Sequence, residues 1–102
     1  MIIYNVTVNI EESVADEWLS YMKSVHIPDV METGCFTEFK ICELLTRQAD
    51  ETGRTYAIQY SSNSMEEYEI YQREYSTPLQ AEHSKRYEGK FVAFRSLMKV
   101  VN

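Results

Sequence analysis

Alternating apolar and polar side chains mark the strands of this chain. Over 2–10, isoleucine, tyrosine and valine occupy every even position, and mostly polar side chains occupy the odd ones. The segment 55–62 alternates in the same way, and 35–45 and 90–101 also have the composition of strands. Because successive side chains of a strand point to opposite faces, the pattern predicts four strands, the first with one strongly apolar face.

Apolar residues at helical spacing follow the first and third strands. The first set lies within 11–25 and comprises Val14, Trp18, Tyr21, Met22 and Val25. The second set follows Ser64 and comprises Met65, Tyr68, Tyr71, Tyr75 and Leu79. Ser13 and Ser64 each stand just before acidic residues in a pattern that resembles a capping box. We therefore expect a helix to begin at each serine.

A proline and then a glycine follow each predicted helix. Pro28 is expected to break the first helix and to push Ile27 out of the helical region, and Pro78 is expected to break or redirect the second. A short second helical segment should follow each proline and end at a glycine: Pro28–Thr33 with Gly34, and Leu79–Tyr87 with Gly89. The same plan of strand, serine-capped helix, proline, short helix, glycine and strand thus occurs twice.

The order of these elements predicts the fold class. The polar segment 46–54, which contains Gly53, is interpreted as a hairpin loop between the second and third strands. We therefore expect a single α+β domain over 1–102: a ferredoxin-like βαββαβ unit, whose four-stranded antiparallel sheet carries its helices on one face. The other face would be bare, so we expect a homodimer through the open sheet face, closing into a dimeric α/β barrel.

Composition narrows the range of partners. The 102 residues carry a net charge of −6, which opposes binding to nucleic acid, so no nucleic-acid partner is expected. Basic residues gather near the end of the chain and are interpreted as a solvated face, with a local anion site as the alternative. They are Lys85, Arg86, Lys90, Arg95 and Lys99.

The sequence also indicates the location of the protein and the redox state of its cysteines. The segment 1–10 lacks the basic residues and long apolar run of a signal peptide, and no stretch approaches the ~18 apolar residues of a membrane span. Cys35 and Cys42 lie in one predicted strand and are expected to point to opposite faces without pairing. We expect a cytoplasmic protein that contacts no membrane.

Two phrases of the sequence carry a resemblance to known proteins: W-x-x-x-M-K-x-V-H-I-P over 18–28 and A-E-H-x-K-R-Y-x-G-K-F-V-A-F-R over 81–95. They resemble a bacterial family known only as a domain of unknown function, DUF4286, within the dimeric α/β-barrel superfamily. That superfamily includes monooxygenases of the antibiotic-biosynthesis type and haem-degrading monooxygenases. The resemblance implies the fold and leaves the chemistry to the individual side chains.

His83 and Asn5 are the candidate catalytic residues, and the resemblance implies a role for both. In the haem-degrading branch a histidine late in the second helix binds iron, and an asparagine of the first strand lies near the haem. His83 matches the first position and Asn5 roughly matches the second. The tryptophan of that pattern is absent, since the nearest positions hold Tyr71 and Arg73. We expect no cofactor, with haem as the alternative, and His83 could equally move a proton or have only a structural role.

His26 is interpreted as a residue near a helix C-terminus, where an imidazole can satisfy free carbonyls. The two histidines occupy different positions in the two half-units, so they are not expected to form a metal pair. No metal-binding spacing of histidine or cysteine occurs in the sequence, and no metal site is expected.

Trp18, Arg95 and Gln59 are the candidate ligand-binding residues. Asn5, Gln59 and other uncharged polar residues share one strand face, where they could bind a small aromatic or polar ligand beside Arg95 as an anion anchor. Alternatively they satisfy one another across a dimer. In a site between helices and sheet, Trp18 would form an apolar wall.

Two functions remain open. The first is a homodimeric small-molecule-binding protein, including a cofactor-free monooxygenase or a related enzyme. The alternative is a non-catalytic dimeric interaction or regulatory module. A cavity of roughly 300 Å³ or more that contains His83 or Asn5 would favour the first, and a filled interior would favour the second.

Overall fold

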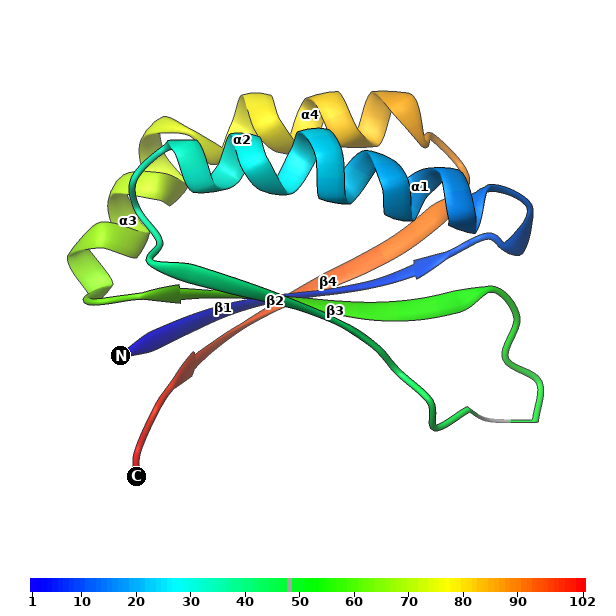
Figure 1. Cartoon of the computed structure of the whole chain (residues 1–102), viewed down its shortest axis with the longest axis horizontal. Coiled ribbons are helices and arrows are strands. Elements are labelled where there is room, and N and C mark those ends of the chain that lie inside the picture. The colour runs from blue at the N-terminus through cyan, green and yellow to red at the C-terminus, as the bar shows by residue number, and fades with distance from the viewer. Residues whose placement is uncertain (48) are drawn as a thin grey trace.

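Figure 1 shows the computed structural model, which describes residues 1–47 and 49–102. Four strands form one antiparallel sheet, and the helices lie together on one face of it. The strand order is β2-β3-β1-β4, with β1 at Ile2–Ile10, β2 at Glu38–Glu43, β3 at Arg54–Ser62 and β4 at Phe91–Lys99. The chain has the predicted α+β ferredoxin-like fold.

The register of the central strand separates two faces. Tyr4 of β1 lies opposite Tyr60 and Leu97, whereas Asn5 lies opposite Gln59 and Ser96. The even positions of β1 pack under the helices, as their apolar pattern predicts. The largest fully buried side chains of this layer are Trp18, Tyr60, Tyr71, Ile10, Ile27 and Ile58.

The first helical layer has four segments: η1 (Glu12–Val14, a 3₁₀ turn), α1 (Ala15–Tyr21), η2 (Met22–His26, a π-helix) and α2 (Ile27–Glu32). From α1 to α2 the helix runs without a break. The predicted break at Pro28 is wrong, because Ile27 is helical at φ −62° and ψ −44°. In a regular α-helix the proline ring would clash with the carbonyl of Ser24. The wider π turn, in which the Ile27 amide donates to the carbonyl of Met22, directly precedes the proline.

The second helical layer does break. It consists of α3 (Met65–Glu74) and α4 (Ser76–Arg86), joined at Tyr75, whose φ of −124° departs from helical geometry. Pro78 therefore lies in the first turn of α4, where its missing amide hydrogen leaves no bond unmade. The second segment was predicted to begin at Leu79. The break comes earlier because proline is tolerated inside a first turn.

The two predicted helix caps have different outcomes. Ser64 caps α3, since its hydroxyl accepts a hydrogen bond from the amide of Glu67 at 3.3 Å, as predicted. Ser13 lies inside the 3₁₀ turn, which begins with no side-chain cap, so that prediction is wrong. At the far ends, Gly34 and Gly89 have positive φ of 78° and 75°, a conformation that favours glycine after a helix.

β2 is shorter than the predicted strand over 35–45. Cys35 precedes it and is buried, and Cys42 is exposed within it. The argument that both cysteines share a strand is therefore wrong, although both are free thiols. The predicted loop 46–54 includes Gln48, which lies outside the described residues.

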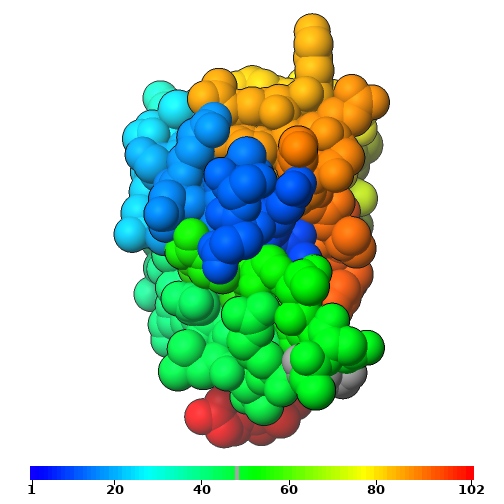
Figure 2. All heavy atoms as spheres, turned by 90° about the vertical axis from the view of Figure 1, so that its right-hand side faces the viewer, coloured from blue at the N-terminus to red at the C-terminus, as the bar shows by residue number. Residues whose placement is uncertain are grey.

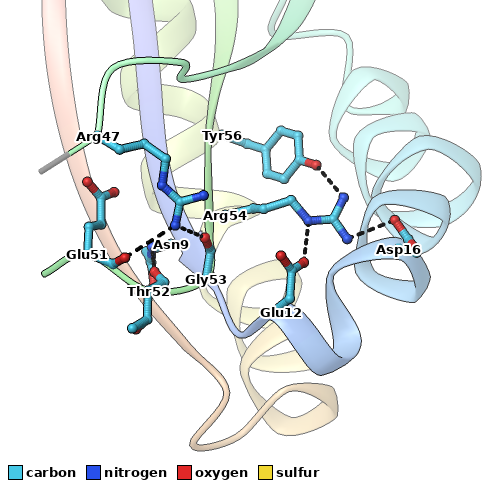
Figure 3. Close-up of polar contacts among 9 residues, drawn as sticks. All are labelled: Asn9, Glu12, Asp16, Arg47, Glu51, Thr52, Gly53, Arg54 and Tyr56. Atoms are coloured by element: carbon cyan, nitrogen blue, oxygen red, sulfur yellow. Dashed lines mark hydrogen bonds and ion pairs between the residues drawn. The ribbon is translucent and has the colours of Figure 1, made fainter. Parts of the chain in front are cut away.

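The hairpin between β2 and β3 meets the start of the first helical layer at one end of the molecule, as Figure 2 shows in green and blue. Arg54 forms ion pairs with Glu12 at 2.6 Å and Asp16 at 2.9 Å, and it donates to the hydroxyl of Tyr56 at 3.4 Å (Figure 3). The two carboxylates raise the pKa of Arg54. This cluster, whose two carboxylates are exposed, ties the sheet to the first helical layer, so we assign it a structural role.

Over the described ranges, the helices are too short or too polar for any of them to cross a membrane.

Candidate functional site

A cavity of about 30 Å³ lies between the helical layer and the sheet. It has room for one or two water molecules. Side chains from β1, β3, β4, η2, α3 and α4 line it, and most of them are apolar or aromatic. The polar groups on its wall are Tyr4, Tyr60, Tyr71, His26, Gln80, His83 and Arg95.

His83 is held in one tautomer by Trp18. The indole Nε1–H of Trp18 donates to Nε2 of His83 at 2.9 Å, and this bond is buried. Because Nε2 accepts a hydrogen bond, the single proton of the neutral imidazole must be on Nδ1. Trp18, expected to be an apolar wall, is therefore a polar partner that fixes the ring.

His83 remains neutral at ordinary pH. Burial, followed by the nearby His26 and Arg95, lowers its pKa from 6.5 to about 4. The ring also contacts Tyr87 at 5.6 Å and Phe91 at 4.7 Å between ring centroids. His83 is thus oriented on all sides, and its free nitrogen is a donor rather than a base.

The structure brings His26 next to His83, with 5.5 Å between ring centroids. His26 ends the π turn inside a continuous helix, so its predicted role at a helix C-terminus is wrong. Within the described part of the chain, neither of its ring nitrogens has a hydrogen-bond partner. Burial lowers its pKa, with Arg95 acting in the same direction and Asp29 in the opposite one. His26 is therefore the neutral imidazole of the cavity that is free to accept a proton.

Arg95 and Tyr4 form the second polar pair of the cavity. Nε of Arg95 donates to the hydroxyl of Tyr4 at 3.1 Å, and the amide of Gln80 donates to the same oxygen at 3.4 Å. Arg95 lies opposite Val6 on the helix-facing side of β4, so it does not serve the polar strand face. It forms no ion pair with any acidic residue that the structure describes.

Asn5 and Gln59 lie on the other face of the sheet, opposite one another in the register of β1 and β3. The side-chain amide of Asn5 donates to Thr7 at 3.0 Å. Asn9 of the same face donates to Thr55 at 3.0 Å. Asn5 and Asn9 thus find partners on the same face within the chain. Of the predicted site residues, the structure brings Trp18, His83 and Arg95 together and leaves Asn5 and Gln59 on the opposite side of the sheet.

The open face also carries exposed apolar side chains along β4. Val92 is 71% exposed and Phe94 is 61% exposed, and Met98 continues the row. Alternation along β4 places all three on the face that no helix covers.

The residues present do not fit a haem. Nε2 of His83 already accepts the Trp18 hydrogen bond, and the cavity of about 30 Å³ is far too small for the macrocycle. Among the described histidines, cysteines and acidic residues, no group of three or more is placed to hold a metal ion.

The match to family models decides where this chain belongs. The model of the family described as "Domain of unknown function (DUF4286)" matches residues 1–101. The chain is a member of this family. None of the curated proteins matches the sequence significantly.

Solved structures share the fold at low identity. The chain is similar to a protein of the ethyl tert-butyl ether d (EthD) family from Bacillus halodurans, with 9% identity, a TM-score of 0.72 and coverage of 99% of this chain and 100% of that one. It is similar to SnoaB, a cofactor-independent oxygenase from Streptomyces nogalater, with 10% identity, a TM-score of 0.66 and coverage of 99% and 94%. A dimeric ferredoxin-like protein from an uncultured marine organism has 14% identity, a TM-score of 0.71 and coverage of 100% and 96%. These likenesses extend to the fold alone.

Proposed function

We propose that this protein binds a small molecule in the cavity between helices and sheet, and that His26 serves there as a general base. The observation that supports this proposal most directly is that polar side chains from separate elements converge on one cavity. Two imidazoles, a guanidinium and a tyrosine hydroxyl come from four separate elements and line one cavity. Polar groups that converge in an apolar pocket, with a pKa perturbed by burial, are typical of ligand sites.

The arrangement suits proton abstraction next to a carbonyl or phenol oxygen. A neutral His26 would take the proton from the ligand, and the electron pair would move onto the ligand oxygen. Arg95 and Tyr4 would stabilise the resulting oxyanion as a cation and a hydrogen-bond donor. This step is common to isomerase-type enzymes and to cofactor-free monooxygenases, which use the carbanion further with dioxygen.

The size of the cavity favours a second function, a non-catalytic dimeric module. At about 30 Å³ it lies well below the ~300 Å³ typical of ligand pockets. A substrate of aromatic size would fit only if the long side chains of Arg95 and Gln80 swing away from the wall. A module that only dimerises would need no such movement.

A ligand screen by thermal shift separates the two functions. The panel includes quinones, phenols, flavins and haem, tested on the wild type, on His26→Gln and on Lys23→Gln, an exposed control in the same π turn. We expect at least one quinone or phenol to raise the Tm, and the shift to persist in Lys23→Gln. Substrate conversion, followed by absorbance, should be lost in His26→Gln. A panel with no shift in the wild type would exclude the small-molecule function and leave the module.

We also propose that the open sheet face joins two copies in a homodimer. Val92, Phe94 and Met98 form an exposed apolar strip, and exposed apolar surface of this kind often marks an interface. A structural relative is described as dimeric, which supports the proposal. Sedimentation at micromolar concentration should give a dimer for the wild type and a monomer for Phe94→Lys. Leu45→Lys, which changes an exposed residue of the β2–β3 connection, should remain dimeric. A monomeric wild type would refute the dimer.

A further inference from the structure

Three polar groups of the cavity wall, Arg95, Tyr4 and His83, have donors to offer a ligand, whereas Tyr60, Tyr71 and Gln80 can donate or accept. A guanidinium has donors only, so Arg95 offers none of its nitrogens as an acceptor. Arg95 is exposed to solvent, and its one described side-chain contact is the bond from Nε to Tyr4, so its terminal nitrogens have no protein acceptor.

The hydroxyl of Tyr4 is also a donor toward the ligand, because its oxygen is already occupied as an acceptor. Its oxygen accepts from Arg95 and from Gln80, and both contacts use the lone-pair side of the hydroxyl. The phenol proton must then point elsewhere. Burial raises the pKa of Tyr4, although Arg95 opposes this, so the hydroxyl keeps that proton.

His83 adds another donor. Its acceptor nitrogen is occupied by Trp18, so Nδ1–H is the group that it can offer to a ligand. Nδ1–H makes no bond to any other group in the described part of the chain. His26 is left as the one imidazole with a lone pair to offer.

The charge of the cavity wall also favours an anionic ligand. The chain as a whole has 16 acidic and 10 basic residues. Yet the described wall of this cavity contains Arg95 and neither aspartate nor glutamate. An unpaired guanidinium beside a cavity without carboxylates, in an acidic protein, is a local reversal of charge that favours an anion.

We infer that the ligand of this cavity is a compact molecule with a deprotonated oxygen, a carboxylate, enolate or phenolate, held by Arg95, Tyr4 and His83. The inference rests on the proposed small-molecule site and names the chemical class that the site takes. An oxyanion accepts several hydrogen bonds at once, which matches these three donors. A neutral amide of the same shape carries no charge for Arg95 to pair with, although Tyr60, Tyr71, Gln80 and His26 could accept bonds from its N–H groups.

Matched pairs of probes test the inference. Acetate is compared with acetamide, and benzoate with benzamide, by NMR titration of the His83 and Arg95 side-chain signals. We expect saturable shifts with the anion of at least one pair and binding about tenfold weaker or more for its amide. Equal or tighter binding of the amides would overturn the inference while the small-molecule site stands. No binding of any of the four probes would overturn the inference, and the broader ligand screen would then decide the site itself.

Two substitutions sharpen the result. Arg95→Gln removes the cation, and Gln80→Glu places a carboxylate on the wall without changing its shape. Each should weaken the anion about tenfold or more. Arg73→Gln, which removes an exposed cation of α3, should leave binding unchanged. Anion binding that survives in both wall variants would contradict the inference.

The tautomer of His83 gives a readout that needs no ligand. In long-range ¹⁵N–¹H spectra of the free protein, Nδ1 should appear protonated and Nε2 unprotonated. The opposite tautomer would remove one donor from the wall and overturn its part of the inference. In Trp18→Phe the constraint is released, and a mixture of both tautomers is expected.

Discussion

The two halves of the chain share one plan, and they depart from it at the same place. In the first half the helical layer passes Pro28 without a break, because a π turn precedes the proline. In the second half the layer breaks at Tyr75, and Pro78 lies in the first turn of the new helix, which begins at Ser76. Each solution avoids the clash between a proline ring and a preceding carbonyl. The halves therefore follow one pattern in sequence and two geometries in space.

This difference creates the site. The π turn ends at His26, and the new helix α4 carries His83, so two histidines that occupy unequal positions in their half-units become neighbours. Trp18 of the first half then bonds to His83 of the second.

Trp18→Ala tests the contact between the halves and should have the largest effect. Trp18 is fully buried and carries the hydrogen bond to His83, so its loss leaves a cavity and an unpaired imidazole nitrogen. We expect the free energy of unfolding to fall by about 3–5 kcal/mol, measured by urea denaturation. Tyr75→Ala, at the exposed joint of the second half, should cost less than about 1 kcal/mol. Equal costs would show that Trp18 does not link the halves.

The pH dependence of stability tests the site that the halves share. The folded pKa of His83, about 4, lies below its unfolded value of 6.5, so the unfolded state binds the proton more readily. Stability should therefore be complete above pH 6.5 and decrease as the pH falls from 6.5 towards 4. Between pH 7.5 and 5 the loss from His83 should be about 2 kcal/mol.

His83→Gln provides the control for this effect. Urea denaturation at several pH values should show a flatter dependence between pH 7.5 and 5 in this variant. Lys85→Gln, an exposed change in the same helix, should retain the slope of the wild type. If the pH dependence of the free energy of unfolding were the same in His83→Gln as in the wild type, protonation of His83 would not destabilise the fold.

The two serines test the start of each helical layer, with the smallest expected effect. Ser64→Ala removes a hydroxyl that caps α3 and should lower the free energy of unfolding by about 1 kcal/mol. Ser13→Ala removes a hydroxyl that caps nothing in the described structure and should change it by less than about 0.5 kcal/mol. Urea denaturation of both variants measures the difference, and a costlier Ser13→Ala would reverse this contrast.

The period of the apolar residues and the spacing of serine, proline and glycine predicted the architecture well. The apolar period shows which side of each strand or helix is buried. The order of strands, the single helical face and the glycine helix ends are confirmed. The errors lie at Ser13, at Pro28, at Pro78 and at the start of β2. At each of these positions several backbone geometries satisfy the same local residues, and packing in the folded chain selects one.

The site was predictable only in part. Side-chain chemistry identified His83, Trp18 and Arg95, whereas His26 was missed because no residue type signals a π turn. Tyr4 was classed as core, since its hydroxyl bonds depend on β4 and α4. Alternation alone predicted that Asn5 lies on the polar face of β1, and the structure confirms this. Asn5 follows Tyr4, and the apolar face of β1 is the one that the helices cover.

The π turn at Met22–His26 also has a consequence for chain length within the family. A π turn holds one residue more than the α-helix around it, and each residue of an α-helix advances by about 100°. Deleting Ser24 should remove the π turn, rotate the residues before it relative to those after it, and bring the Pro28 ring against the preceding turn. Trp18, which bonds to His83, and His26, which lines the cavity, could then no longer both keep their places. The number of residues between the tryptophan and the histidine is therefore a marker, readable in any family member, of whether its cavity holds the second imidazole.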